Sequence, residues 1–95
     1  MVPMIPDRLL AIRKALALSQ EKMGQLVGAS FASVNRWEGG HSSPIGATLD
    51  IYRAIDAALA AGRDGAAIRS AFAGDRGQFL HQLFSMAYGK KRGVA

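Results

Sequence analysis

The stretch SQEKMGQLVGASFASVNRWEG, residues 19–39, decides the fold expected for this chain of 95 residues. It predicts two short helices joined by a tight turn at Gly28, because glycine can take the left-handed backbone conformation that such a turn needs. Gly24 is small where the two helices nearly touch, and Val34 is a stiff apolar residue that packs the second helix onto the first. This combination is typical of a helix-turn-helix.

The residues around this stretch predict further helices. A first helix is expected from residue 6 or 7 to residue 15, where Pro6 and Asp7 suit a helix amino end. Ser19 and Ser30 are expected to cap the next two helices, and Gly39 and the glycine after it stop the second of these. Apolar residues at helical spacing predict helices over residues 44–61, 66–73 and 78–88. The fold class is therefore all-α.

From Leu9 to Ile55 the chain resembles the helix-turn-helix of the phage Cro/repressor family, also called the Xre family of transcriptional regulators. The matching residues are Arg13, Leu18-Ser19-Gln20, Gly28, Ser33-Val34-Asn35-Arg36-Trp37-Glu38-Gly39 and Pro44. The resemblance implies a compact four- to five-helix bundle of the lambda-repressor-like DNA-binding type, with an additional C-terminal amphipathic helix. We divide the chain accordingly into a helix-turn-helix domain, residues 1–62, and a helical C-terminal extension, residues 63–95.

The predicted third helix carries side chains that suit the reading of base edges. In the resembling family the first two residues of this helix, and the residue four after the second, usually contact bases; here they are Phe31, Ala32 and Arg36. Arg36 can donate two hydrogen bonds to guanine, Asn35 can pair with adenine or bind a phosphate, and Ala32 and Phe31 can touch a thymine methyl group. The alternatives are a solvated polar face for Asn35 and Arg36 and a packing role for Phe31 beside the N-cap.

Phosphate contacts are expected on either side of this helix. Gln20 lies at the amino end of the second helix, where free backbone amides attract anions, and by resemblance it anchors a phosphate. Donor chemistry and position add four candidates, for which ordinary turn residues are the alternative: Ser33, His41, Ser42 and Ser43. The family often has Lys or Arg in the loop after the third helix and usually has Ala at the position of Gly24, so the chain departs from it twice.

Two further residues of the resemblance have a structural role. The family joins the first helix to the end of the third by a partly buried salt bridge, which implies a pair between Arg13 and Glu38; the alternative is two unlinked surface charges. Trp37 lies three residues after Val34, so it is expected on the inner side of the helix rather than among the base-reading residues.

The last predicted helix carries an apolar stripe that something must cover. Its residues are Phe79, Leu80, Leu83, Phe84 and Ala87. The stripe either packs on the chain's own bundle or forms a dimer interface, and the dimer is preferred because two-fold pairing lets two reading helices contact half-sites about 34 Å apart. Beyond the stripe, Lys90-Lys91-Arg92 is either a solubilising tail or an arm that binds phosphate.

The amino-acid composition argues against several classes of function. The net charge is +5, but six basic and five acidic residues lie in residues 1–62, whereas six basic and two acidic residues lie in residues 63–95. There is no Cys, and His41 and His81 stand isolated, so we expect neither a metal site, nor a cofactor, nor an enzyme. The longest apolar run is far short of the roughly 20 residues that span a bilayer, so we expect no membrane association and a cytoplasmic protein.

The expected function is sequence-specific binding of double-stranded DNA by a homodimeric transcriptional regulator, most simply a repressor that occupies its operator. The alternative is the antitoxin of a toxin–antitoxin pair, because the run from Ser30 to Glu38 also resembles antitoxins with this type of domain. In that case the apolar stripe of the last helix would hold the toxin as a protein partner.

Overall fold

Six α-helices and no strand make up residues 4–72 and 75–89, the part of the chain that the computed structural model describes. The helices are α1 (Pro6–Ala15), α2 (Gln20–Val27), α3 (Phe31–Glu38), α4 (Gly46–Ala60), α5 (Gly65–Phe72) and α6 (Arg76–Tyr88). The all-α prediction is confirmed, and each expected helix is present. No helix in the described ranges is long and apolar enough to cross a membrane.

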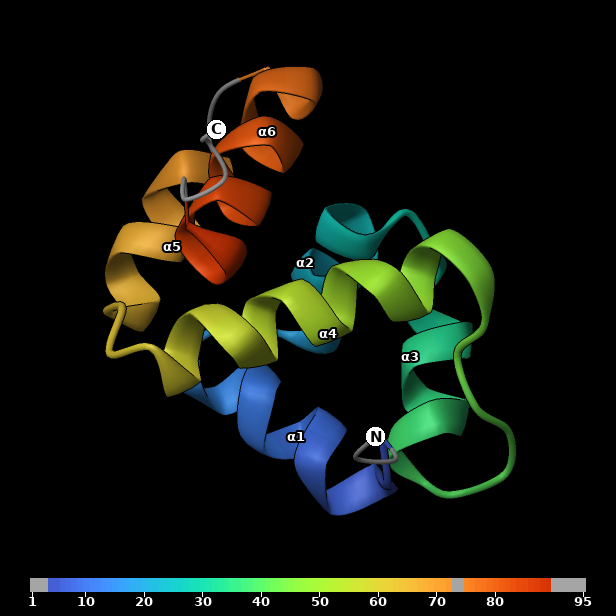
Figure 1. Ribbon diagram of the computed structural model, residues 1–95. Coiled ribbons are helices and arrows are strands. Elements are labelled where there is room, and N and C mark those ends of the chain that lie inside the picture. Colours follow the sequence, from blue (N-terminus) through green and yellow to red (C-terminus); the bar gives the residue numbers. More distant parts are fainter. Residues whose placement is uncertain (1–3, 73–74, 90–95) are drawn as a thin grey trace.

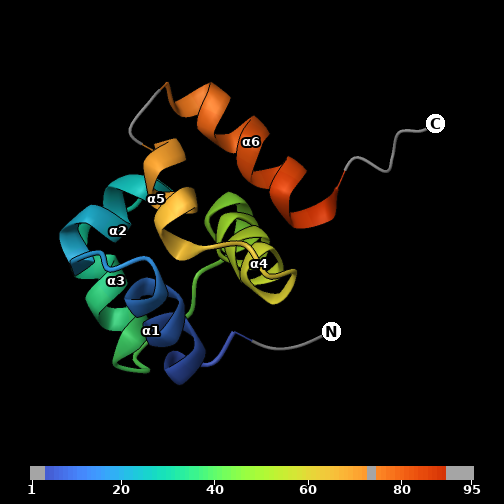
Figure 2. The ribbon, with the colours of Figure 1, turned by 90° about the vertical axis from the view of Figure 1, so that its left-hand side faces the viewer.

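The longest helix, α4, lies across the middle of the molecule (Figure 1). In Figure 1, α1 and α3 lie on one side of α4, while α5 and α6 lie on the other. Figure 2 looks nearly along α4 and shows α1, α2 and α3 grouped together, with α6 crossing on the far side of α4. The helix-turn-helix of α2 and α3 is therefore backed by α1 and α4, and the C-terminal pair of helices closes the remaining face.

Short polar side chains start three of the helices. Ser19, Ser30 and Asp75 are N-caps with extended backbone, and each accepts a hydrogen bond from the backbone N–H three residues further along. Such a cap satisfies one of the free N–H groups at a helix start and stabilises the helix by about 1 kcal/mol. The two serine caps identified in the sequence therefore set where α2 and α3 begin.

A left-handed residue follows the C-cap of three of the helices. Ala17, Gly40 and Gly62 follow the C-caps of α1, α3 and α4 with φ values of 57°, 81° and 91°. In each case the next N–H bonds back to the carbonyl five residues earlier, which satisfies a carbonyl that the helix leaves free. Ala17 is the one non-glycine of these three, so the α1–α2 turn holds its conformation against a steric cost.

One apolar core joins all six helices. Its buried members are Leu9, Ile12, Leu16, Met23, Leu26, Val27, Val34, Ile51, Tyr52, Ala54, Ile55, Ala58, Ile68, Phe79 and Leu83. Ile68 comes from α5, whereas Phe79 and Leu83 come from α6, and all three are fully buried. The boundary expected at residue 62 therefore does not separate two cores, since the C-terminal helices complete the core of the helix-turn-helix.

Gly24 makes the closest approach within the helix-turn-helix. A Cβ atom placed on this buried glycine would lie 2.7 Å from the carbonyl oxygen of Ala29 and 3.2 Å from the carbonyl carbon of Ser30. The sequence had suggested that Gly24 faces the third helix, but its neighbour is the turn backbone just before α3. The turn can pass over α2 at this distance because no side chain intervenes.

The substitution Gly24→Ala is expected to lower the free energy of unfolding by about 1 kcal/mol. The methyl group would meet backbone that cannot rotate away, a strain of about 1–3 kcal/mol, which outweighs the gain of about 1 kcal/mol from better helix propensity. Urea denaturation measures the difference, with Gln25→Ala, an exposed position in the same helix, as the matched control. A Gly24→Ala protein more stable than the wild type would show that the turn is not tightly packed.

Candidate nucleic-acid interface

The helix α3 has a packed side and an exposed side. Val34 is fully buried, and the half-buried Trp37 contacts Tyr52 of α4 edge to face, with ring centroids 6.1 Å apart and an interplanar angle of 81°. Trp37 therefore lies on the inner side, as expected. The candidate base-reading residues are all exposed: Phe31, Ala32, Asn35 and Arg36. These four residues, called the reading face below, share one side of a helix that is fixed from behind.

Arg13 and Glu38 form an ion pair between α1 and the last residue of α3. Arg13 Nε donates to Glu38 Oε2 at 2.7 Å and Arg13 Nη2 donates to Glu38 Oε1 at 2.9 Å, a two-pronged geometry. A third donor, Arg13 Nη1, binds the carbonyl oxygen of Leu18 at 2.9 Å. One guanidinium therefore holds the α1–α2 turn and the carboxyl end of α3 together.

The ion pair continues to the reading face through Gln20. Gln20 Nε2 donates to Glu38 Oε1 at 3.0 Å, and Asn35 Nδ2 donates to Gln20 Oε1 at 3.2 Å. The four side chains thus form one polar network from α1 through the start of α2 to the exposed side of α3. The sequence had placed Gln20 and Asn35 in separate roles and gave no sign that they are bonded to each other.

The network fixes the charge of its carboxylate. Burial by itself would raise the pKa of Glu38, but the hydrogen bonds from Arg13 and Gln20 and the positive charge of Arg13 outweigh it and hold the pKa below its ordinary value of 4.5. Glu38 is therefore ionised near neutral pH although its side chain is only 6 % exposed. On the other side of the pair, the same hydrogen bond raises the pKa of Arg13.

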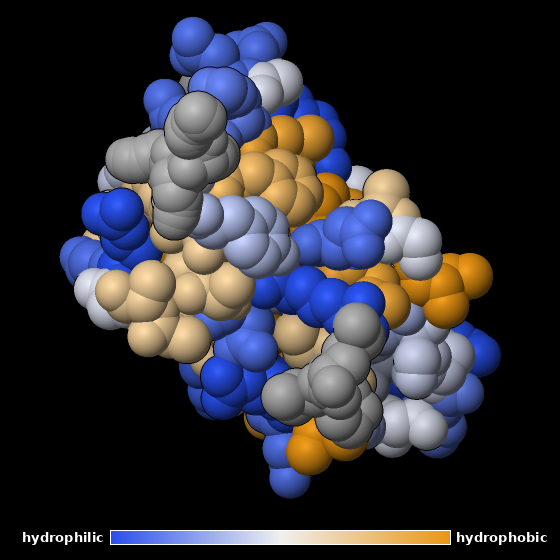
Figure 3. All heavy atoms as spheres, viewed as in Figure 1, coloured by the Kyte–Doolittle hydropathy of each residue, from blue (hydrophilic) through white to orange (hydrophobic). Residues whose placement is uncertain are grey.

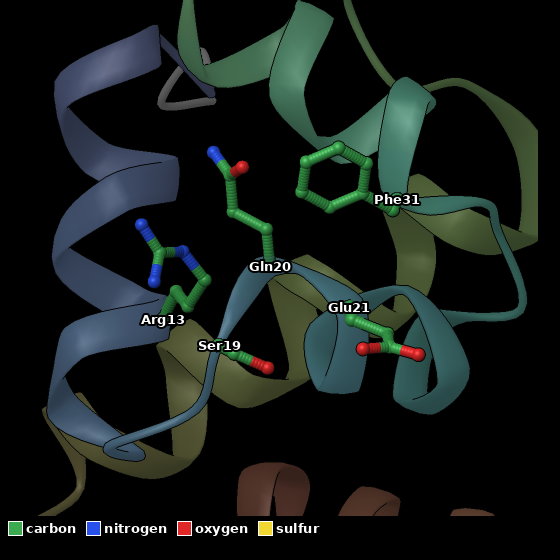
Figure 4. Close-up of a pocket in the computed structure, with 5 residues that line it drawn as sticks. All are labelled: Arg13, Ser19, Gln20, Glu21 and Phe31. Carbon is green, nitrogen blue, oxygen red and sulfur yellow. The ribbon is translucent and has the colours of Figure 1, made fainter.

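An open hollow of about 760 Å³ lies in front of this network. It is lined by Arg13, Ser19, Gln20, Glu21 and Phe31. Figure 4 shows the Phe31 ring pointing from α3 toward the side chain of Gln20, with Arg13 on the opposite wall. Phe31 is 55 % exposed, so its ring is a wall of the hollow and not a packed cap on the helix start.

Glu21 is the residue of this region that the sequence analysis did not weigh. Glu21 is exposed and lines the hollow from α2, with its carboxylate directed away from the ring of Phe31 (Figure 4). A negative charge there favours the amino end of α2 but repels a phosphate. The sequence could not show that Glu21 borders the same hollow as Phe31 of α3.

The remaining phosphate candidates differ in how freely they can donate. His41 and Ser43 are exposed in the loop after α3, whereas Ser42 and Ser33 are half-buried. The hydroxyl of Ser33 accepts a hydrogen bond from Ser30 Oγ at 3.1 Å, so Ser33 takes part in the start of α3. Gln20 keeps one free N–H on its amide nitrogen after its bond to Glu38.

The stripe on α6 does not form a dimer interface as a whole, which corrects the expectation for two of its five residues. Phe79 and Leu83 are fully buried in the chain's own core. Leu80 and Ala87 are half-buried, and Phe84 is exposed, so these three keep a surface. Figure 3 shows apolar side chains gathered where α6 lies. The basic run Lys90-Lys91-Arg92 lies outside the described residues.

Loss of the carboxylate in Glu38→Gln should lower the free energy of unfolding at pH 7 by about 3 kcal/mol, because Arg13, only 17 % exposed, loses its counter-charge. The lowered pKa of Glu38 also makes wild-type stability pH-dependent. The contribution of the Glu38 carboxylate to stability is complete above its ordinary pKa of 4.5 and is lost as the pH falls through the folded value.

The measurement is denaturant unfolding between pH 7 and pH 3. The wild type and Glu38→Gln should converge as the pH falls. Glu21→Gln removes an exposed carboxylate from the first turn of α2 and should differ from the wild type by less than about 1 kcal/mol throughout. A constant gap between the wild type and Glu38→Gln over this range would contradict a charged role for Glu38.

Comparison with protein-family models, with curated proteins and with solved structures found no match for this chain. Functional interpretation therefore depends on the geometry. That geometry is an exposed polar and aromatic helix face, a charged network that holds it from behind, and a hollow beside it. Among the described residues no group of three or more His, Cys, Asp or Glu is placed to hold a metal ion.

Proposed function

We propose that this protein binds double-stranded DNA sequence-specifically as a transcriptional regulator of the Cro/repressor type, with α3 in the major groove. The observation that carries the proposal is the reading face: four exposed side chains on one side of a helix whose other side is held by Val34 and Trp37. A helix presented in this way can enter a major groove about 12 Å wide. The protein acts by occupying a DNA site, as a repressor does, and performs no reaction.

Each residue of the reading face has a matching base edge. The exposed guanidinium of Arg36 suits O6 and N7 of guanine, and Ala32 and Phe31 suit the methyl group of thymine. Asn35 gives one N–H to Gln20, which leaves its second N–H and its carbonyl oxygen for N7 and N6 of adenine. The hydrogen bond to Gln20 holds the amide of Asn35 in one orientation before DNA arrives.

Contacts to the DNA backbone come from the ends of the neighbouring elements. The free N–H of Gln20 and the exposed His41 and Ser43 flank the reading face on two sides. The loop after α3, residues 39–45, carries no Lys or Arg. Neutral donors therefore make many of the phosphate contacts. The negative charge of Glu21 repels phosphate, so binding depends more strongly on an exact fit between protein and DNA.

A second copy of the chain completes the site in this proposal. A single helix-turn-helix reads few base pairs, and a two-fold pair places two reading helices one turn of DNA apart. The surface for pairing is the outer side of α6, where Phe84 and Tyr88 are 36 % and 54 % exposed. Their rings stack with centroids 6.0 Å apart, so they offer a pre-ordered aromatic contact.

Replacing Arg36 by Ala is expected to lower affinity for the preferred site about 10- to 100-fold while scarcely changing affinity for unrelated DNA, because a two-pronged contact to guanine discriminates by about 1–3 kcal/mol. Fluorescence anisotropy with matched and scrambled duplexes measures both. Arg63→Ala removes the same charge from the loop between α4 and α5 and serves as the control. Equal losses on both duplexes would show that Arg36 reads no base.

Selection of bound sites from random duplex DNA tests the function as a whole. It should enrich inverted half-sites whose centres are about 34 Å apart, and the affinity for them should fall steeply with salt, with a log–log slope of about −0.9 for each phosphate contacted. Enrichment of a single unpaired half-site would remove the dimer from the proposal. No enrichment together with a flat salt response would rule out DNA binding as the function.

A further inference from the structure

The carboxyl end of α2 is held from outside the helix-turn-helix. A helix leaves its last four carbonyl oxygens without partners in the helix, and in α2 these belong to residues 24–27. The turn itself satisfies the first, since the N–H groups of Gly28 and Ala29 both donate to the carbonyl of Gly24. Thr48 Oγ1 of α4 donates to the last, the carbonyl of Val27, at 3.3 Å.

The two middle carbonyls are both bound by Arg76. Its Nη1 donates to the carbonyl oxygen of Gln25 at 3.1 Å and to that of Leu26 at 2.8 Å. A guanidinium at this place also lies at the negative end of the α2 dipole. The guanidinium reaches the turn as well, because a Cβ atom placed on Gly28 would be 3.1 Å from Arg76 Nη2.

The backbone of Arg76 is held in place. It is the first residue of α6, directly after the N-cap Asp75, whose side chain accepts a hydrogen bond from the N–H of Gln78 at 2.9 Å. Phe79, one turn further on, is fully buried and contacts Phe72 of α5 with ring centroids 5.4 Å apart. The backbone from which the Arg76 side chain extends is therefore anchored to the core, which sets the guanidinium within reach of α2.

We propose that Arg76 is a positioning residue for DNA recognition: it locks the α2–α3 turn and thereby the direction in which α3 presents the reading face. The inference rests on the proposed function for its DNA part and on the contacts above for its structural part. A residue outside the segment that resembles the helix-turn-helix family thus sets the geometry of that segment. Without the Arg76 side chain, the carbonyl groups of Gln25 and Leu26 would have only water as a hydrogen-bond donor, and the turn would open more often.

The chain provides a matched control. Arg69 of α5 donates through Nη1 to the carbonyl oxygen of Leu16 at 3.1 Å, so it binds the end of α1 in the way that Arg76 binds the end of α2. Arg69→Ala and Arg76→Ala therefore remove the same charge and the same kind of contact from two different turns. Of the two contacts, that of Arg76 lies at the turn that leads into α3.

The experiment compares Arg76→Ala, Arg76→Lys and Arg69→Ala by two measurements, at a temperature where denaturation shows each to be folded. The first is amide hydrogen exchange in the free protein at Ala29, whose N–H bonds within the turn. Arg76→Ala should speed this exchange about tenfold relative to amides of α1. Arg76→Lys, which keeps a charged donor, should restore most of the protection, and Arg69→Ala should leave Ala29 unchanged.

The second measurement is affinity for the selected DNA site as a function of salt. Arg76→Ala should lose about tenfold in affinity with an unchanged salt slope, because a positioning residue neutralises no phosphate. A salt slope reduced by about 0.9 in Arg76→Ala would show that Arg76 contacts a phosphate. If Ala29 exchanges equally fast in Arg76→Ala and Arg69→Ala, Arg76 does not lock the turn. If the wild type selects no DNA, the proposed function fails, while the exchange result still decides whether Arg76 locks the turn.

Discussion

The hydrogen-bonded ion pair between Arg13 and Glu38 is the constraint on which the helix-turn-helix depends. It joins the first helix to the last residue of α3, and the same guanidinium binds the carbonyl of Leu18 in the intervening turn. One planar group with five donors thus fixes α1, the turn that follows it and the end of α3, which is twenty-five residues away in the sequence. Because both partners are largely shielded from water, the pair is directional and costly to break from one side.

The network that grows from this pair links stability to the proposed recognition. Gln20 bonds to the carboxylate of Glu38 and accepts from Asn35, so an exposed amide is oriented by a partly buried charge. Orientation before binding matters because the free energy of ordering a side chain is otherwise subtracted from affinity. The proposed reading face therefore combines one amide held by this network with an Arg36 side chain that remains free to adapt.

The C-terminal helices do more than add an amphipathic surface to the helix-turn-helix, because they complete its core and hold two of its helix ends. Phe79 and Leu83 close the core, and Arg69 and Arg76 bind carbonyls at the ends of α1 and α2. Gly65 lets the start of α5 lie directly on α1, since a Cβ atom there would be 2.1 Å from the carbonyl oxygen of Ala15. A helix-turn-helix of this size buries little apolar surface alone, and these helices supply the missing cover.

The sequence by itself determined the helices and their order, because caps, left-handed glycines and apolar spacing act over four or five residues. Ser19 and Ser30 start α2 and α3 where expected, Gly28 turns between them, and the ion pair at Arg13 was expected from the family resemblance. The tertiary structure alone decided three things: that Phe79 and Leu83 face inward, that Gln20 joins Glu38 to Asn35, and that Arg76 reaches the α2–α3 turn. These depend on contacts across as many as fifty-one residues. No local pattern encodes which of two apolar surfaces will cover a stripe, or which helix end a long arginine side chain will reach.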